Sequence, residues 1–92
     1  MISQSNKDEV IVIGLGYVGL TLSAYLASTG LSVHGVEVRD AVLSNLGKHK
    51  AFFLEENLDE MLDIVIENKS FSFSKSIPNS KNQRTFNILN GT

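Results

Sequence analysis

Apolar and polar positions alternate with two different periods along this chain. Val10–Ile13 is an uninterrupted β-branched run, which is typical of a strand buried on both faces. Tyr17–Thr29 has helical spacing and predicts a helix that ends at Gly30, where a left-handed cap is expected. We expect that helix to bury a face made of its larger apolar residues, Val18, Leu22, Tyr25 and Leu26. Small residues lie near that face. Ser32–Val38 alternates and indicates a second strand.

The second half of the chain repeats the alternation of helix and strand. Asp40 is a suitable N-cap for a short helix, Ala41–Leu46, that Gly47 closes. Asn57 and Glu60 resemble a capping box at the start of a longer amphipathic helix. The apolar positions of that helix are Leu58, Met61, Leu62, Val65 and Ile66. Phe71–Ser74 and Thr85–Leu89 predict a third and a fourth strand, separated by a loop around Pro78.

Strands that alternate with helices predict an α/β fold with right-handed crossovers. We therefore expect a parallel sheet of about four strands, in the order 3-2-1-4, flanked by helices. This arrangement is part of a doubly wound fold. The chain has 92 residues, which is short for a complete domain of that type. We expect a polar, disordered segment at 1–9, followed at 10–92 by the N-terminal, truncated part of such a domain.

Three glycines follow the first strand with the spacing G-x-G-x-x-G: Gly14, Gly16 and Gly19. In this pattern the first glycine allows a sharp turn, the second lets a pyrophosphate approach the backbone, and the third brings the helix close to the strand. The start of the helix supplies N–H donors and a positive field for the phosphates. The predicted donors are the backbone N–H groups of Leu15, Gly16, Tyr17 and Val18.

Glu37 lies 18 positions after Gly19, at the end of the second predicted strand. A carboxylate there accepts hydrogen bonds from the adenosine ribose and repels a 2′-phosphate, which favours NAD over NADP. Val38 and Arg39 complete the predicted cofactor site, and Arg39 leaves NADP open because a guanidinium is a good partner for a phosphate. FAD and S-adenosylmethionine are alternatives. Residues 38–42 match the flavin pattern poorly, and Ile13 is not the acid that typically precedes the glycines in methyltransferases.

The composition of the chain excludes several classes of binding partner. The net charge is −2, which argues against nucleic acid, and the chain has no cysteine. No apolar run is long enough to span a bilayer, so we expect no membrane contact and a cytoplasmic location. His34 and His49 have no metal-spaced partner in sequence, and we predict no metal site. Four aromatic residues are expected in the core: Phe52, Phe53, Phe71 and Phe73.

The heptad Gly14-Leu15-Gly16-Tyr17-Val18-Gly19-Leu20 resembles the opening of the UDP-glucose/GDP-mannose dehydrogenase family. Members typically read V-I-G-L-G-Y-V-G-L-P-L-A, then G-x-D-x-x on the second strand. Here Thr21 replaces a proline and Glu37 replaces an aspartate. Phe53–Leu58 is similar in outline to the family's E-P-x-L segment, with Glu55 as its acid, and Phe86–Thr92 falls where members run into V-P-T-P.

The glycine motif and Glu37 predict a Rossmann-like NAD(P)-binding fold. The resemblance implies the NAD-binding portion of a nucleotide-sugar 6-dehydrogenase, an oxidoreductase that serves polysaccharide precursor synthesis. The catalytic and substrate domains of such an enzyme would be absent from residues 10–92. Such enzymes oxidise the sugar C6 alcohol to a carboxylate through a cysteine nucleophile. This chain has no cysteine, so no catalytic residue carries over, and the nucleotide sugar would bind only in a full-length parent. The alternative is a stand-alone, non-catalytic nucleotide-binding or assembly module. Because a truncated sheet leaves an open edge, we also expect a homo-oligomer.

Overall fold

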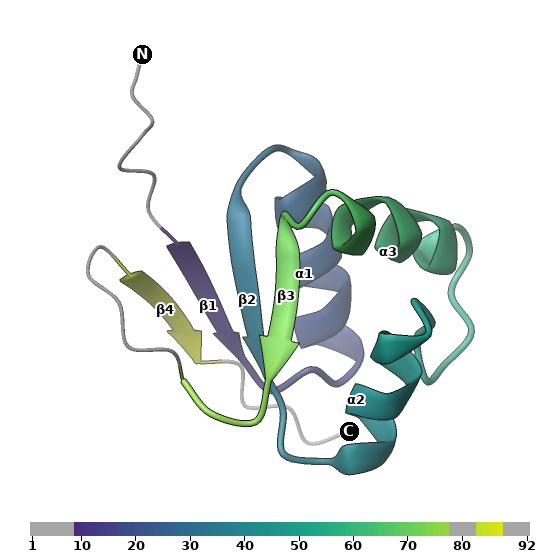
Figure 1. Cartoon of the computed structure of the whole chain (residues 1–92), viewed down its shortest axis with the longest axis horizontal. Coiled ribbons are helices and arrows are strands. Elements are labelled where there is room, and N and C mark those ends of the chain that lie inside the picture. Colours follow the sequence, from purple (N-terminus) through teal and green to yellow (C-terminus); the bar gives the residue numbers. More distant parts are fainter. Residues whose placement is uncertain (1–8, 78–82, 88–92) are drawn as a thin grey trace.

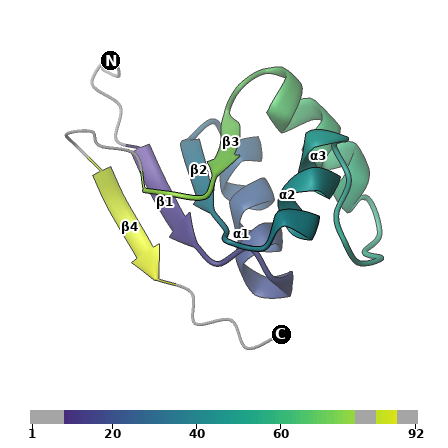
Figure 2. The ribbon, with the colours of Figure 1, turned by 60° about the horizontal axis from the view of Figure 1, so that its bottom comes forward.

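The structure is a computed structural model that describes residues 9–77 and 83–87. Its strands form one parallel sheet in the order β3-β2-β1-β4. They are β1 (Glu9–Ile13), β2 (Ser32–Val36), β3 (Phe71–Ser74) and β4 (Gln83–Asn87). The helices α1 (Tyr17–Ser28), α2 (Asp40–Gly47) and α3 (Leu58–Glu67) lie on one side of the sheet (Figures 1 and 2). The predicted α/β class, parallel sheet and strand order are confirmed, and within the described residues the helices cover a single face.

The two faces of the sheet differ in chemistry. Val10, Val33 and Phe71 are paired across β1, β2 and β3, so their side chains share a face, and that face packs against the helices. On the opposite face, His34 lies between Ile11 and Ser72. The Phe-Ser-Phe-Ser alternation of β3 therefore places its aromatic residues toward the core and its serines away from it.

Helix α1 buries a different face from the predicted one. Val18 and Tyr25 are 53% and 61% exposed. The buried residues are mostly small: Gly19, Leu20, Ser23, Ala24 and Ala27. The expectation was wrong for Val18 and Tyr25, because small side chains let the helix lie close to the sheet and leave no room for larger ones. Leu26 is partly buried and packs against the core, as predicted.

The predicted side-chain caps at Asp40 and Asn57 were wrong. Asp40 is the first residue of α2 and Arg39 is its N-cap, without a side-chain hydrogen bond. Asn57 is the N-cap of α3, but its backbone is left-handed (φ 67°) and its side chain makes no capping bond, so the capping box does not form. Gly30 does take the expected left-handed conformation, with φ 103°. A side-chain cap requires an extended backbone at the capping residue, and the connection before α3 does not provide one.

Helix α3 buries Leu58, Leu62 and Val65 in the core next to α1. Phe71 is fully buried, and Phe53 and Phe73 pack against the core. Phe52 is 37% exposed, so its predicted place in the core was wrong. It faces the end of β2 instead, as described below.

The strand boundaries differ from the predicted ones by one or two residues. β1 begins at Glu9, β2 ends at Val36, and β4 lies two residues earlier than the predicted 85–89. The predictions for residues 1–8, for the loop at 78–82 and for the C-terminal 88–92 lie outside the described residues. None of the helices in the described part of the chain has the length and apolar character that a bilayer crossing requires.

Candidate functional site

The glycine turn leaves the carboxyl end of β1 and is fastened to β2. Gly14 has φ 94°, a conformation that favours glycine, and its N–H donates to the carbonyl of Val36 at 2.8 Å. The Leu15 side chain is fully buried above Gly35, where an added Cβ would come within 2.7 Å of the leucine methyls. The turn therefore has a fixed conformation before any ligand arrives.

Gly19 brings α1 against the turn, as its position in the motif predicts. A Cβ at Gly19 would lie 1.8 Å from the carbonyl oxygen of Gly14, far inside van der Waals contact. Because this neighbour is backbone, it cannot rotate away. Only glycine fits here, and the start of α1 is thereby held at the end of β1.

The N-terminus of α1 presents backbone donors without a side-chain cap. Its N-cap, Gly16, is extended and makes no side-chain hydrogen bond, and the first turn contains no acidic residue. The backbone ladder starts with the N–H of Leu20 donating to Gly16 at 2.9 Å. The N–H groups of Tyr17 and Val18 precede that bond, in the turn where an α-helix lacks internal acceptors. This arrangement suits an anion.

Glu37 lies directly beside the turn. Its side chain is 4% exposed, and its Oε1 accepts the N–H of Leu15 at 2.8 Å. Its Oε2 accepts the N–H of Arg39 at 2.9 Å. The predicted proximity of the acid and the glycine motif is thus present. The N–H of Leu15 is engaged by the carboxylate and is therefore not a free donor.

Arg39 folds back onto the same carboxylate. Its Nε donates to Oε2 at 2.8 Å and its Nη2 to Oε1 at 3.2 Å. The Arg39 side chain holds the pKa of Glu37 at about 2, helped by the backbone donors and opposed by burial. Each carboxylate oxygen therefore accepts one backbone and one side-chain hydrogen bond. A ribose diol can bind Glu37 only where it replaces the side-chain pair.

An aromatic wall continues from this ion pair to the start of α1. The guanidinium of Arg39 lies 5.3 Å from the Phe52 ring centre. Phe52 contacts Phe53 at 4.8 Å between ring centres, and Phe53 contacts Tyr17 at 5.0 Å. The Tyr17 hydroxyl donates to Glu55 at 3.0 Å, and this hydrogen bond raises the pKa of Tyr17.

The connection between α2 and α3 thus reaches the start of α1 and the Glu37–Arg39 pair. Of this connection, the sequence analysis had singled out only Glu55, from the family pattern. Val38, beside Glu37, is 72% exposed and accessible to a ligand. The signal that could have located the wall is the run of two phenylalanines in an otherwise polar loop.

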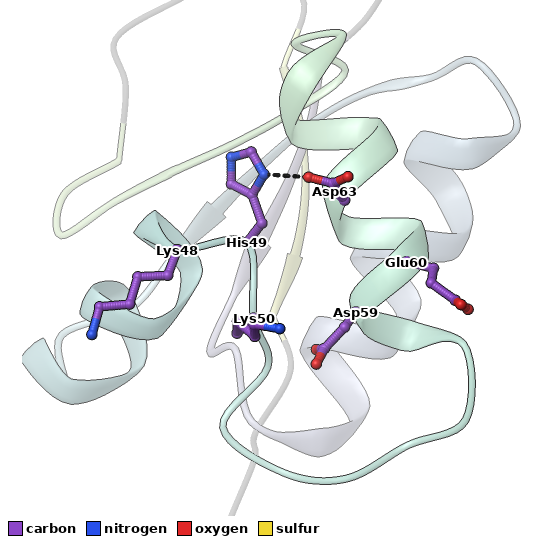
Figure 3. Close-up of a pocket in the computed structure, with 6 residues that line it drawn as sticks. All are labelled: Lys48, His49, Lys50, Asp59, Glu60 and Asp63. Carbon is purple, nitrogen blue, oxygen red and sulfur yellow. Dashed lines mark hydrogen bonds and ion pairs between the residues drawn. The ribbon is translucent and has the colours of Figure 1, made fainter.

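The two histidines have different surroundings. Nδ1 of His34 lies 2.7 Å from Ser72 Oγ and its Nε2 lies 2.7 Å from Ser74 Oγ, and burial lowers the pKa of the ring. His49 follows α2 and its Nδ1 lies 2.7 Å from Asp63 Oδ1 (Figure 3). Glu67 offers a further carboxylate oxygen within 4.8 Å. His49 therefore has two carboxylate neighbours that the sequence spacing did not reveal.

A glycine turn, an open helix N-terminus and a neighbouring acid on a parallel sheet define a dinucleotide-binding domain of the Rossmann type. Residues 8–90 match the family model described as "UDP-glucose/GDP-mannose dehydrogenase family, NAD binding domain". The chain belongs to this family, and its cofactor is NAD.

The relatives found are nucleotide-sugar dehydrogenases. A UDP-N-acetyl-D-mannosamine dehydrogenase of Campylobacter jejuni is 36% identical over 59 residues, 64% of this chain and 14% of that protein. The enzyme of that name from Pyrococcus horikoshii is 28% identical over 80 residues, 87% of this chain and 19% of its own length. The structure of the UDP-N-acetyl-mannosamine dehydrogenase Cap5O from Staphylococcus aureus matches with a TM-score of 0.77 at 25% identity, over 86% of this chain and 19% of that one. The chain therefore spans less than a fifth of these relatives.

Proposed function

We propose that this chain is the NAD-binding part of a nucleotide-sugar 6-dehydrogenase that oxidises C6 of a UDP- or GDP-sugar to the uronate, in polysaccharide precursor synthesis. The observation that supports the proposal is the 2.8 Å hydrogen bond from the Leu15 N–H to Glu37, which holds this carboxylate beside a helix N-terminus without a side-chain cap. The names of the relatives favour a UDP-linked N-acetylated sugar as substrate.

In this proposal the described residues hold the adenosine diphosphate half of NAD. The N–H groups of Tyr17 and Val18 face the diphosphate, and Gly16 leaves space for it. Glu37 accepts the ribose hydroxyls once the Arg39 side chain moves, and the exposed Val38 borders the adenine. NAD supplies the hydride acceptor. The oxidation steps themselves are assigned to no residue of this chain, which contains no cysteine.

Calorimetric titration with ADP and with NAD tests the site, since ADP carries the ribose and diphosphate that these residues address. We expect saturable binding of both ligands, with NAD bound more tightly than NADP because Glu37 repels a 2′-phosphate. Gly16→Ala keeps an accessible backbone conformation (φ −76°) and adds a methyl group at the phosphate approach. It should weaken ADP binding at least tenfold.

The matched control is Gly47→Ala, because a Cβ at Gly47 meets no atom within 4 Å and the residue is far from the turn in sequence. This variant should bind ADP as the wild type does. A folded wild-type chain that binds neither ADP nor NAD would contradict the proposal, as would equal affinities of the two glycine variants. Sugar oxidation is tested separately, by following NADH formation with UDP-N-acetylmannosamine in the natural full-length gene product.

Self-association is a further part of the proposal. β4 ends the described sheet and pairs there with β1 alone. An open strand edge recruits another strand. We expect light scattering to show an average mass that rises with concentration, and a constant monomer mass at high concentration would contradict it.

A further inference from the structure

A group of metal-ligand side chains lies on the helical side of the molecule, apart from the cofactor edge. His49, Asp63 and Glu67 each offer one donor atom, and these atoms lie within 4.8 Å of one another. Asp63 and Glu67 are four residues apart on α3, so their side chains share one face of that helix. His49 reaches them from the connection after α2. The group therefore combines one imidazole nitrogen with two carboxylate oxygens from two separate segments.

The spacing is close to that of a coordination sphere. Zn–N and Zn–O distances of about 2.0–2.2 Å place neighbouring ligands about 3.4 Å apart in a tetrahedron. The His49–Asp63 pair is at 2.7 Å and must open slightly, while the remaining donors must close from at most 4.8 Å. Asp63 is 69% exposed and Glu67 is also exposed, so both side chains can rotate without disturbing the core.

The backbone around His49 is held in place before any ion arrives. The N–H of His49 donates to Leu46 at 2.9 Å, and that of Lys50 donates to Asn45 at 2.9 Å. The next N–H, that of Ala51, donates to the Asp59 carboxylate of α3 at 2.8 Å. These bonds tie the histidine segment to both helices. Closing the group around an ion therefore requires rotation of side chains and no rearrangement of these backbone bonds.

The neighbouring surface forms a hollow of about 320 Å³ lined by Lys48, His49, Lys50, Asp59, Glu60 and Asp63. Figure 3 shows His49 and Asp63 directed toward each other across it, while Lys48 extends away from Asp63. With Glu67, the carboxylates near the group outnumber the two lysines. This hollow leaves space for the water ligands that complete a three-residue site.

We propose that His49, Asp63 and Glu67 bind one divalent transition-metal cation of the Zn²⁺ type, which links the end of α2 to α3. One imidazole with two carboxylates suits Zn²⁺, Co²⁺ or Ni²⁺, whereas Mg²⁺ and Ca²⁺ prefer oxygen ligands alone. The site is separate from the glycine turn. Its existence does not depend on the cofactor assignment.

Titration of the full 92-residue chain with ZnCl₂ and, separately, with CoCl₂ tests the proposal. We expect one equivalent to bind, a visible Co²⁺ absorption band, and a higher melting temperature in Zn²⁺ but not in Mg²⁺. His49→Gly removes the imidazole and suits the left-handed backbone at this position (φ 62°). It should lower Zn²⁺ affinity at least tenfold. Asp63→Asn and Glu67→Gln, both on exposed side chains, should each lower it several-fold.

The chain has two histidines, so His34→Gln is the matched control and should bind Zn²⁺ as the wild type does. Absence of Zn²⁺ binding by the folded wild type overturns the proposal. So does wild-type affinity in Asp63→Asn and Glu67→Gln together, or an equal loss in His34→Gln and His49→Gly. Circular dichroism of each variant separates loss of the site from loss of the fold.

Discussion

Two connections in this molecule lead into helices, and they are built in opposite ways. The turn from β1 to α1 consists of Gly14, Leu15 and Gly16, and its shape follows from missing side chains and a 2.8 Å backbone bond to Val36. The connection from α2 to α3 spans residues 48–57 and has non-glycine residues, His49 and Asn57, in the left-handed region. Its shape follows from side-chain contacts to other elements. The first connection depends on its own glycines and on backbone and carboxylate contacts to the end of β2, whereas the second depends on side-chain contacts to several other elements.

The sharpest test of the local turn is Gly19→Ala. The added methyl group would lie 1.8 Å from the Gly14 carbonyl oxygen, so α1 must move off the sheet. We expect a loss of at least about 3 kcal/mol in the free energy of unfolding, measured by urea denaturation. Gly47→Ala, with open space around its Cβ, should change stability by less than about 1 kcal/mol. A similar stability for both variants would mean that the helix does not rest on the turn.

This difference explains what the sequence could predict. Gly14, Gly16 and Gly19 have functions that depend on their own backbone, so their spacing indicated the turn, the neighbouring acid and the cofactor. Parallel strands and their order followed from the alternation of elements. The prediction of the inner face of α1 was wrong for Val18 and Tyr25. It rested on hydrophobicity, whereas α1 lies so close to the sheet that mostly small side chains fit between them.

The conformation of the second connection could not be predicted from the sequence, because its contacts join residues that are distant along the chain. The hydrogen bond of Asp59 to Ala51 crosses eight residues, and the contact of Tyr17 with Glu55 crosses thirty-eight. No local period encodes such pairs. The contact between His49 and Asp63 likewise forms only when the chain folds. The lack of a metal-binding sequence motif therefore did not exclude it.

Glu37→Gln tests whether the buried acid holds the turn as well as a ligand. The substitution removes a charge that accepts four hydrogen bonds, and it should destabilise the chain by about 1–3 kcal/mol at pH 7. The pKa of Glu37 is lowered from 4.5 to about 2 in the folded chain, so its contribution is present above pH 4.5 and is lost as the pH falls toward 2.

The measurement is the urea midpoint of wild type and variant between pH 7 and pH 2. The difference between the two chains should shrink as the pH falls through that window, because protonation of Glu37 makes the wild type resemble the variant. A difference that stays constant with pH would show that the carboxylate charge has no part in holding the turn.

Phe53→Ala tests the second connection, from α2 to α3. Phe53 packs between Tyr17 and Phe52 and against the core, and its loss should cost about 1–2 kcal/mol. Tyr17→Phe keeps the ring and removes only the exposed hydroxyl bond to Glu55, so it should change stability by less than about 0.5 kcal/mol. Both values come from urea denaturation. A larger loss of stability in Tyr17→Phe than in Phe53→Ala would show that the hydrogen bond to Glu55 stabilises this connection more than aromatic packing does.

The smallest effect is expected for Arg39→Ala. The guanidinium of Arg39 donates hydrogen bonds to Glu37 on one side and lies against Phe52, in the second connection, on the other. A ribose diol needs the hydrogen-bonding positions on Glu37 that the Arg39 side chain occupies. Arg39 is 45% exposed, so its ion pair is worth about 0.5–1 kcal/mol. Arg39→Ala should therefore tighten ADP binding by about two- to fivefold in calorimetry. Weaker ADP binding by this variant would show instead that Arg39 contacts the ligand directly.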